Sequence, residues 1–190
     1  SEEATAADAF ELLDSKRLSG IAVVVVHTAG LLADYYRANA EHFGRWEPIR
    51  PQGYYDAATI RQRYVDYEQQ HLHGTAAYFI GVRDGHVIAH CSLTNIIYGP
   101  FRAGFIGYGV SKALEGTGCM RQLCEVVIAH AFKVLELNRV MANYMPANQR
   151  SGHLLQKLGF AEEGYAKKYL KINGRWEDHI LTALVNPVAF

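Results

Sequence analysis

The sequence predicts an α/β (α+β) fold in a single domain covering residues 1–190. Short β-branched runs alternate with segments whose apolar residues recur at helical spacing. Asp84-Gly85 and Asn173-Gly174 each separate two apolar runs, which is the pattern of a tight β-hairpin. A chain of 190 residues that is 49% hydrophobic can build one well-packed core and is short for two. Residues 1–17 are expected to be an N-terminal extension of this domain.

The first part of the chain predicts helices around one strand. The β-branched run 21–26 predicts a buried strand, and the prolines and glycine of 44–55 predict a loop. Asp56 is expected to cap the helix that follows this loop. Helices are predicted over residues 2–13, 31–43 and 56–73.

The rest of the chain predicts mostly strands, interrupted by two helices. One helix follows Gly118 and carries an apolar stripe to Val134, and the other begins near Ser151 and is ended by Gly159. The predicted strands are 76–83, 86–95, 104–110, 139–144, 160–172 and 176–185.

Composition excludes several classes of protein. Lys+Arg and Asp+Glu both count 19, so no net charge favours DNA or another polyanion as a partner. The first residues are acidic where a secretory peptide is basic, and 21–26 is far shorter than the roughly 20 residues of a membrane helix. We therefore expect a cytoplasmic protein without a membrane partner. Three cysteines without C-x-x-C spacing predict neither a disulfide framework nor a metal site.

The most informative segment is the glycine-bearing turn 115–121, which follows one predicted strand and opens a helix. Unpaired N–H groups at the positive end of a helix dipole are suited to a pyrophosphate. The segment is not a P-loop, because no Gly-Lys-Ser/Thr follows, and Arg121 breaks the dinucleotide G-x-G-x-x-G pattern. It therefore predicts a phosphate-bearing cofactor other than ATP or NAD. The alternative interpretation is a plain strand-to-helix connection.

Two motifs together resemble the GCN5-related N-acetyltransferase (GNAT) superfamily. The first is the turn at 115–120 with its flanking strand and helix, and the second, more specific, is Asn148-x-x-Ser151-x-x-Leu154 continuing to Phe160. Trp46-Glu47-Pro48 and the segments 141–146 and 163–167 further resemble the RimJ branch of this superfamily. The similarity runs from about residue 18 to residue 187.

The resemblance implies a fold, a donor and an acceptor. The implied GNAT fold is a mixed central sheet, splayed between two strands and flanked by helices, and the implied donor is acetyl-CoA. RimJ-type enzymes acetylate the N-terminal alanine of a small-subunit ribosomal protein, so the implied partner is that N-terminal peptide, with the ribosome itself as a further candidate. The oligomeric state stays open.

The resemblance also implies which residues hold the coenzyme. The pantetheine arm would pair with the backbone of Gly109 and Val110, since glycine suits strands that a ligand approaches closely. Members of the superfamily have Gln or Arg where this chain has Glu115, and Gly or Ala where it has Met120. The predicted coenzyme-binding residues are Gly109, Val110, Glu115, Gly116, Thr117, Gly118, Cys119, Met120, Arg121, Asn148 and Ser151.

The expected reaction is direct transfer of the acetyl group to an amine. Ser151 is predicted to protonate the departing thiolate, and a backbone N–H near Gly109 would polarise the carbonyl. The positions that carry a basic carboxylate in related enzymes are Phe105 and Leu170 here, so Glu47 is the nominated base or amine-binding group. An α-amino group has a pKa of roughly 7.7 to 8.0, against about 10.4 for lysine, which favours an N-terminal acceptor.

Other interpretations of these residues remain open from the sequence. Asn148 and Ser151 are also good helix caps, and Glu47 also suits a solvated loop. Trp46 and Tyr54-Tyr55 suit either the core or a peptide groove. Cys119 at a helix N-terminus would also suit an acetyl-cysteine intermediate, although direct transfer is favoured. Alternative functions are acetylation of a small-molecule amine, such as an antibiotic or polyamine, and a non-catalytic CoA-binding regulatory module.

Overall fold

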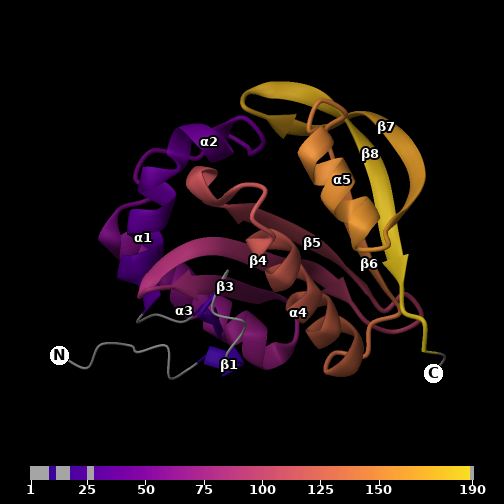
Figure 1. Cartoon of the computed structure of the whole chain (residues 1–190), viewed down its shortest axis with the longest axis horizontal. Coiled ribbons are helices and arrows are strands. Elements are labelled where there is room, and N and C mark those ends of the chain that lie inside the picture. Colours follow the sequence, from indigo (N-terminus) through magenta and orange to yellow (C-terminus); the bar gives the residue numbers. More distant parts are fainter. Residues whose placement is uncertain (1–8, 12–17, 25–27, 189–190) are drawn as a thin grey trace.

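A computed structural model describes residues 9–11, 18–24 and 28–188, and its centre is a mixed sheet (Figure 1). The sheet has eight strands in the order β1-β2-β3-β4-β5-β6-β8-β7. Neighbouring strands are antiparallel except β5 and β6, which are parallel. The strands are β1 (Ala9–Glu11), β2 (Gly20–Val23), β3 (Ala77–Arg83), β4 (His86–Ile97), β5 (Ala103–Val110), β6 (Arg139–Tyr144), β7 (Ala161–Ile172) and β8 (Arg175–Val185).

Helices cover the sheet and divide its core into two clusters. One cluster joins α4 and Leu155 of α5 to the strands, and the other joins α1, α2 and α3 to them. Alternate residues of β2 serve the two clusters: Ile21 and Val23 the first, Ala22 the second. In Figure 1, α4 lies between α1 and α2 on one side and α5 with β7 and β8 on the other. The helices are α1 (Ala29–Ala38), α2 (Ala40–Gly44), α3 (Ala57–His73), α4 (Cys119–Lys133) and α5 (Gln149–Lys157).

Both predicted hairpin turns are confirmed. Asp84 and Gly85 have φ values of 50° and 74°, and Asn173 and Gly174 have 46° and 80°. Two successive residues with positive φ define the type I′ turn, whose twist matches that of the strands it joins. These turns set the register of β3 with β4 and of β7 with β8.

The predicted helix over 31–43 is wrong in one respect, because it is two helices that meet at Asn39. The Asn39 side chain donates a hydrogen bond to the Tyr35 carbonyl and accepts one from the Lys112 N–H. Because this buried amide bonds to both backbone segments, it ends α1 and ties it to the segment after β5.

Three other expectations fail or hold only in part. Of the predicted helix 2–13, only Ala9–Glu11 lies within the described residues, and it is a strand. The strand predicted over 21–26 ends at Val23. Val24 lies outside the strand, and residues 25–27 are not among the described residues. Asp56 occupies the N-cap position of α3, but its side chain makes no capping hydrogen bond. Within the described ranges, no helix is long and apolar enough to cross a membrane.

The sheet opens between its two parallel strands. β5 pairs with β6 only where Ala103–Phe105 lies beside Arg139–Met141. Beyond that point β5 continues to Val110 paired with β4 alone, and β6 continues to Tyr144 paired with β8 alone. The predicted splay of the central sheet is therefore confirmed, and it leaves the inner sides of both strands available to line a site.

Candidate active site

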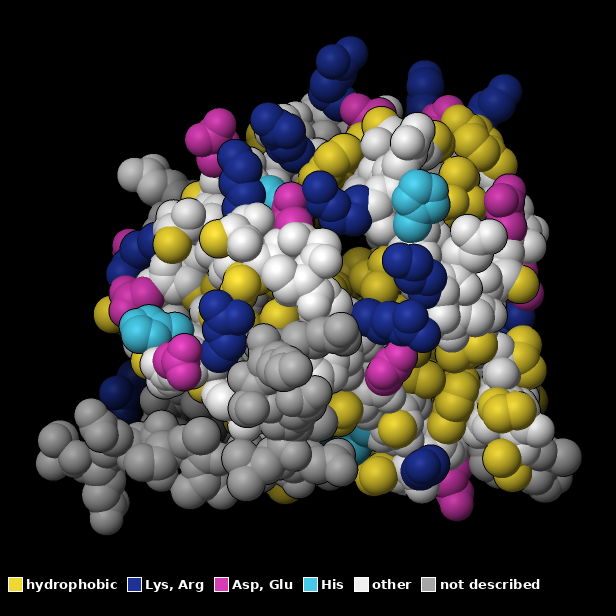
Figure 2. All heavy atoms as spheres, viewed as in Figure 1, with side chains coloured by type: hydrophobic (Ala, Val, Ile, Leu, Met, Phe, Trp, Pro, Cys, Tyr) yellow, Lys and Arg dark blue, Asp and Glu magenta, His cyan; other side chains and the backbone are white. Residues whose placement is uncertain are grey.

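One cavity of about 1000 Å³ lies where β5 and β6 separate. Its walls come from the open ends of these strands, the glycine turn before α4, the start of α5 and the loop after α2. Figure 2 shows a hollow near the middle of this face, with Lys and Arg side chains around it. Every predicted site residue except Cys119 lines this cavity. The structure thus brings together residues from four separate stretches of the chain.

The backbone of Gly109 is held from behind by a buried aromatic cluster. The Tyr35 hydroxyl donates to the Gly109 carbonyl at 3.2 Å and lies 2.8 Å from Nδ1 of His90. A Cβ at Gly109 would fall 2.5 Å from Cε1 of His90 and 3.0 Å from Phe43. The close approach that requires glycine here is therefore made by His90 of β4 within the chain. A Cβ at Gly107 would meet only Ser92, at 3.6 Å.

The glycine turn has the geometry of an anion cradle. Gly116 and Gly118 have φ values of 73° and 86°, and α4 begins directly after Gly118 without a side-chain cap. The first N–H groups of a helix have no intrahelical partner and carry its positive dipole end. At Gly116 nothing lies within 4 Å of the place a Cβ would occupy. Open space beside these donors fits a pyrophosphate.

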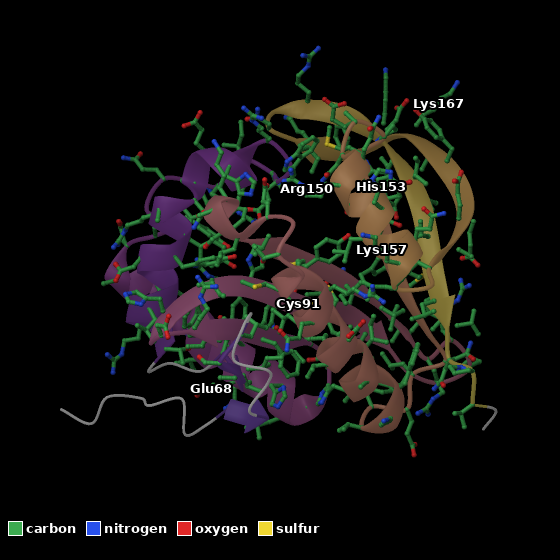
Figure 3. The ribbon with its side chains drawn as sticks, in the orientation of Figure 1. Glu68, Cys91, Arg150, His153, Lys157 and Lys167 are labelled. Atoms are coloured by element: carbon green, nitrogen blue, oxygen red, sulfur yellow. The ribbon has the colours of Figure 1, made fainter. Side chains whose placement is uncertain are left out.

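Basic side chains surround this turn and compensate its one carboxylate. Glu115 forms an ion pair with Arg150, and Nε2 of His42 lies 3.1 Å from the same carboxylate. Arg150, His153 and Lys157 all come from α5 and line the cavity (Figure 3). The negative charge at Glu115 is therefore offset locally, which reduces its expected cost to phosphate binding.

The two side chains that follow the glycines belong to the core. Met120 is 9% exposed and packs in the α4 cluster, although it also touches the cavity wall. Cys119 is fully buried, and its sulfur accepts a hydrogen bond from the Thr117 hydroxyl at 3.2 Å. Because the Cys119 side chain does not line the cavity, it contributes to a coenzyme site only through its backbone, and the acetyl-cysteine alternative loses its geometric basis.

Ser151 and Asn148 carry the capping role and leave the serine hydroxyl available. The Asn148 side chain accepts a hydrogen bond from the Ser151 backbone N–H at 3.3 Å and so caps α5. The Ser151 hydroxyl lies 2.5 Å from the hydroxyl of Tyr108 on β5. Burial raises the pKa of Tyr108 well above its ordinary value, and the hydrogen bond to Ser151 opposes this shift. The phenol is therefore neutral near pH 7 and can donate a hydrogen bond to Ser151.

The loop after α2 supplies the opposite end of the cavity. Trp46, Glu47, Tyr54 and Tyr55 all line it, which favours the groove interpretation over the core for these aromatic residues. The Glu47 side chain is 25% exposed and accepts from Arg50 at 3.3 Å. Burial raises the pKa of Glu47, and the charge of Arg50 acts against this shift. Glu47 is therefore a partly desolvated carboxylate rather than a solvated loop charge.

The loop is tied to the terminal hairpin. The backbone N–H of Asn173, in the β7–β8 turn, donates to the Glu47 carbonyl at 3.0 Å.

His90 of β4 also lines the cavity. Burial, together with the charge of Arg50, lowers the pKa of His90 to about 4, so this imidazole is neutral at physiological pH.

Tyr108 and His179 are among the polar residues of the cavity that sequence reasoning missed. Tyr108 alternates with glycines on β5, so a polar-tipped aromatic in that strand was the available signal. His179 is 4% exposed on β8, and a lone histidine in an apolar strand pattern was the only signal for it.

A comparison with protein families decides the classification. Residues 25–161, which include β5, the glycine turn and α5, match the acetyltransferase (GNAT) domain. The chain belongs to the GNAT acetyltransferase family. It is thus an N-acetyltransferase, and the fold implied by the earlier resemblance is the one observed.

Relatives of this GNAT chain include enzymes of the RimJ type. It is 38% identical to the [ribosomal protein uS5]-alanine N-acetyltransferase of Escherichia coli over 172 residues, 88% of each chain. The ribosomal-protein-S5-alanine acetyltransferase of Vibrio fischeri superposes with a TM-score of 0.88 at 37% identity, covering 94% of this chain and 97% of that one. Mycobacterium smegmatis RimJ, solved in complex with CoA-disulfide, superposes with a TM-score of 0.82 at 27% identity, covering 87% of this chain and 81% of that one.

Proposed function

We propose that the chain acts as one acetyltransferase domain that transfers the acetyl group of acetyl-CoA to the N-terminal alanine of a ribosomal protein. The observation that carries this proposal is a single cavity that runs from the glycine turn, past the Ser151–Tyr108 pair, to Glu47. Its two ends therefore suit a phosphate-bearing donor and an amine acceptor. The relatives named for uS5-alanine acetylation, which match most of the chain, support the choice of acceptor.

The donor supplies an activated acetyl thioester, and the residues around the sheet opening fit its parts. The backbone N–H groups from Gly116 to Arg121 would bind the diphosphate, with Arg150 nearby as a cationic partner. The open edges of Gly109 and Val110 would hold the extended arm, because a strand edge offers main-chain donors and acceptors. Asn148 and Ser151 border the same space from α5.

Proton donation is assigned to Ser151, assisted by Tyr108. A hydroxyl that accepts a hydrogen bond from a neutral phenol releases its own proton more readily, and the departing sulfur needs a proton as the C–S bond breaks. Backbone N–H groups near Gly109 would stabilise the developing oxyanion. Glu47 is assigned to hold the incoming amine, because a partly buried carboxylate attracts a cation more strongly than a solvated one does.

The charges at the acceptor end favour a peptide terminus over a polyamine. A polyamine site needs several carboxylates, whereas here Arg50 and Arg63 line the cavity beside the one carboxylate of Glu47. Arg63 packs 3.8 Å from the centre of the Tyr54 ring, so its charge is fixed there. One carboxylate with two cations suits a single amine followed by peptide carbonyl groups. Localisation in the cytoplasm, on or near the ribosome, is part of the same proposal.

The test is acetylation of defined peptides. The protein is incubated with acetyl-CoA and a short peptide that begins with the alanine of uS5, and the product is mapped by mass spectrometry. We expect one acetyl group on the α-amine, none on an internal lysine, and no reaction with spermidine. CoA binding without transfer to any peptide would instead favour the regulatory module, and preferred transfer to spermidine would favour a small-molecule acetyltransferase.

A further inference from the structure

The reaction proposed above lacks a group that removes the proton of the amine. Phe105 and Leu170 occupy the positions where related enzymes carry a carboxylate, and neither can titrate. Glu47 accepts a hydrogen bond from Arg50, and its assigned role is to hold the amine and not to remove its proton. We propose that the imidazole of His179 accepts this proton, a role that rests on the proposed function of the cavity.

His179 is oriented as a base by the backbone. It lies on β8, is 4% exposed, and lines the cavity. Its Nδ1 lies 3.0 Å from the carbonyl oxygen of Glu177, and a carbonyl only accepts, so Nδ1 carries the hydrogen. In the neutral ring this leaves Nε2 with a lone pair. Over the described part of the chain, no hydrogen-bond partner is assigned to Nε2.

Side chains of β7 and β6 pack beside the His179 ring. On β7, the Tyr169 ring packs 5.7 Å from the His179 ring, and the residue paired with His179 is Ala166. Asn143 of β6 reaches the Tyr169 hydroxyl at 3.5 Å. Other elements contribute many charged and titratable groups to the same cavity. They are Tyr36, His42, Glu47, Arg50, Tyr54, Tyr55, Arg63, Tyr64, Tyr67, Tyr78, His90, Cys91, Tyr108, Glu115, Arg121, Tyr144, Arg150, His153 and Lys157.

The adjacent carboxylate does not compete for the imidazole. Asp178 precedes His179 on β8 and therefore points to the other face of the strand. It accepts from the Tyr165 hydroxyl at 2.7 Å and from the Lys168 N–H at 2.9 Å. Among the described residues, Asp178 therefore interacts with His179 through charge but not through a hydrogen bond, unlike the carboxylate of a catalytic triad.

The proton transfers balance in one turnover. The amine nitrogen forms a bond to the acetyl carbon, and its proton passes to Nε2 of His179. The C–S bond breaks, and the sulfur takes the proton of the Ser151 hydroxyl, while the neutral Tyr108 phenol stabilises the serine oxygen by donating a hydrogen bond to it. The proton on the imidazolium then returns to the serine oxygen through solvent, so that His179 and Ser151 both end the turnover neutral. In this scheme His179 of β8 is the base and Ser151 of α5 is the acid.

The first experiment replaces His179 by asparagine, which keeps an amide donor near the position of Nδ1 and removes Nε2. We expect kcat/KM for the uS5-type peptide to fall about 100-fold, with the Kd for CoA changed less than about threefold. Exogenous imidazole should restore part of the lost rate. The matched control is His86→Asn, because the His86 Nδ1 also bonds the carbonyl two residues before it, at 2.9 Å, on an exposed turn outside the cavity.

A pH profile separates a base from a structural residue. With the amine and an imidazole both required in neutral form, log kcat/KM of the wild-type protein should rise with a slope approaching 2 on the acid side of the profile. His179→Asn should show a slope of 1, from the amine alone. His179→Gln places an amide that can accept a hydrogen bond, but cannot act as a base, near the position of Nε2. This variant should give the same slope of 1 and replaces the asparagine variant in the experiment if that variant does not fold.

Clear outcomes overturn the proposal. A folded His179 variant with wild-type activity, or with the wild-type pH slope, would remove His179 from the reaction while leaving the proposed function intact. A loss of CoA affinity that matches the loss of rate, without rescue by imidazole, would make His179 structural. Wild-type protein that binds CoA and acetylates no peptide would overturn the proposed function and this role together.

Discussion

The hydroxyl groups of Tyr108 and Ser151 lie 2.5 Å apart and join β5 to the first turn of α5. They are 43 residues apart in sequence and meet where β5 and β6 have already separated. The helix cap of α5 uses the backbone of Ser151 and not its hydroxyl. The helix cap and the proposed proton donation therefore involve different atoms of one residue and can be tested separately.

Ser151→Ala should lower kcat about 10- to 100-fold and change the Kd for CoA less than about threefold. The hydroxyl is needed only as the thiolate departs, whereas the cap to Asn148 uses a backbone N–H that alanine retains. Steady-state kinetics with the peptide and calorimetric titration of CoA measure the two quantities. Parallel losses of affinity and turnover would reduce Ser151 to a coenzyme contact.

Tyr108→Phe should lower kcat about tenfold, because the ring stays in place and only the donor to Ser151 is removed. The two residues act in one step, so the double variant with Ser151→Ala should be no slower than Ser151→Ala alone. A double-mutant cycle on kcat measures this coupling. Strictly additive losses would mean that the two hydroxyls act independently.

Gly116→Ala should weaken CoA binding at least tenfold, because a methyl group would enter the open space beside the helix N-terminus. The φ of 73° adds a stability loss of about 1 kcal/mol. Gly85→Ala is the matched control, since Gly85 has a φ of 74° and equally open surroundings in the β3–β4 turn. Equal CoA affinities of the two variants would argue against a phosphate site at Gly116.

Glu47→Gln should raise the peptide KM about tenfold and also stabilise the fold near pH 7. Burial raises the folded pKa of Glu47 above its unfolded value, so the folded state disfavours the carboxylate once the pH exceeds the unfolded pKa. The gain in Tm should therefore vanish below about pH 4. Thermal unfolding from pH 3.5 to 7.5 tests this, with Glu125→Gln on the exposed side of α4 as control. A pH-independent difference in Tm would contradict the assignment.

Acid should destabilise the protein partly through His90. Its folded pKa of about 4 lies below the ordinary imidazole value of about 6.5, so the unfolded chain binds more protons between these limits. The free energy of unfolding should fall as the pH drops through this window, and less steeply in His90→Gln. Burial also lowers the pKa values of His71 and His130, so part of the pH dependence of the unfolding free energy should remain in His90→Gln. Urea titrations at several pH values measure it; identical slopes would contradict this account.

Much of the fold follows from local signals. The strand 139–144 was predicted residue for residue, and both I′ turns were read from an Asp-Gly and an Asn-Gly pair. The break at Asn39 was not predictable, because it depends on a tertiary hydrogen bond to Lys112, which lies 73 residues away. Helical periodicity continues across Asn39, so the pattern gives no reason to end the helix there.

The candidate site was predictable only where its residues form continuous motifs. The glycine turn and the Asn148–Ser151 motif are local, and both were identified from the sequence. Tyr108 and His179 reach the cavity because β5 separates from β6 and β8 pairs with β6, which is a consequence of sheet order. No spacing in the sequence encodes that proximity. Glu47 entered through a resemblance, and its partial burial and ion pair with Arg50 emerged only in three dimensions.

The short contact between Ala103–Phe105 and Arg139–Met141 has a consequence beyond catalysis. Ahead of it, β5 and β6 each leave one side without a neighbouring strand, and such exposed edges readily recruit other extended chains. A donor bound in the gap would occupy those edges and block their pairing with another chain. Occupancy of the gap by the donor would then decide how much of these two strand edges stays unpaired.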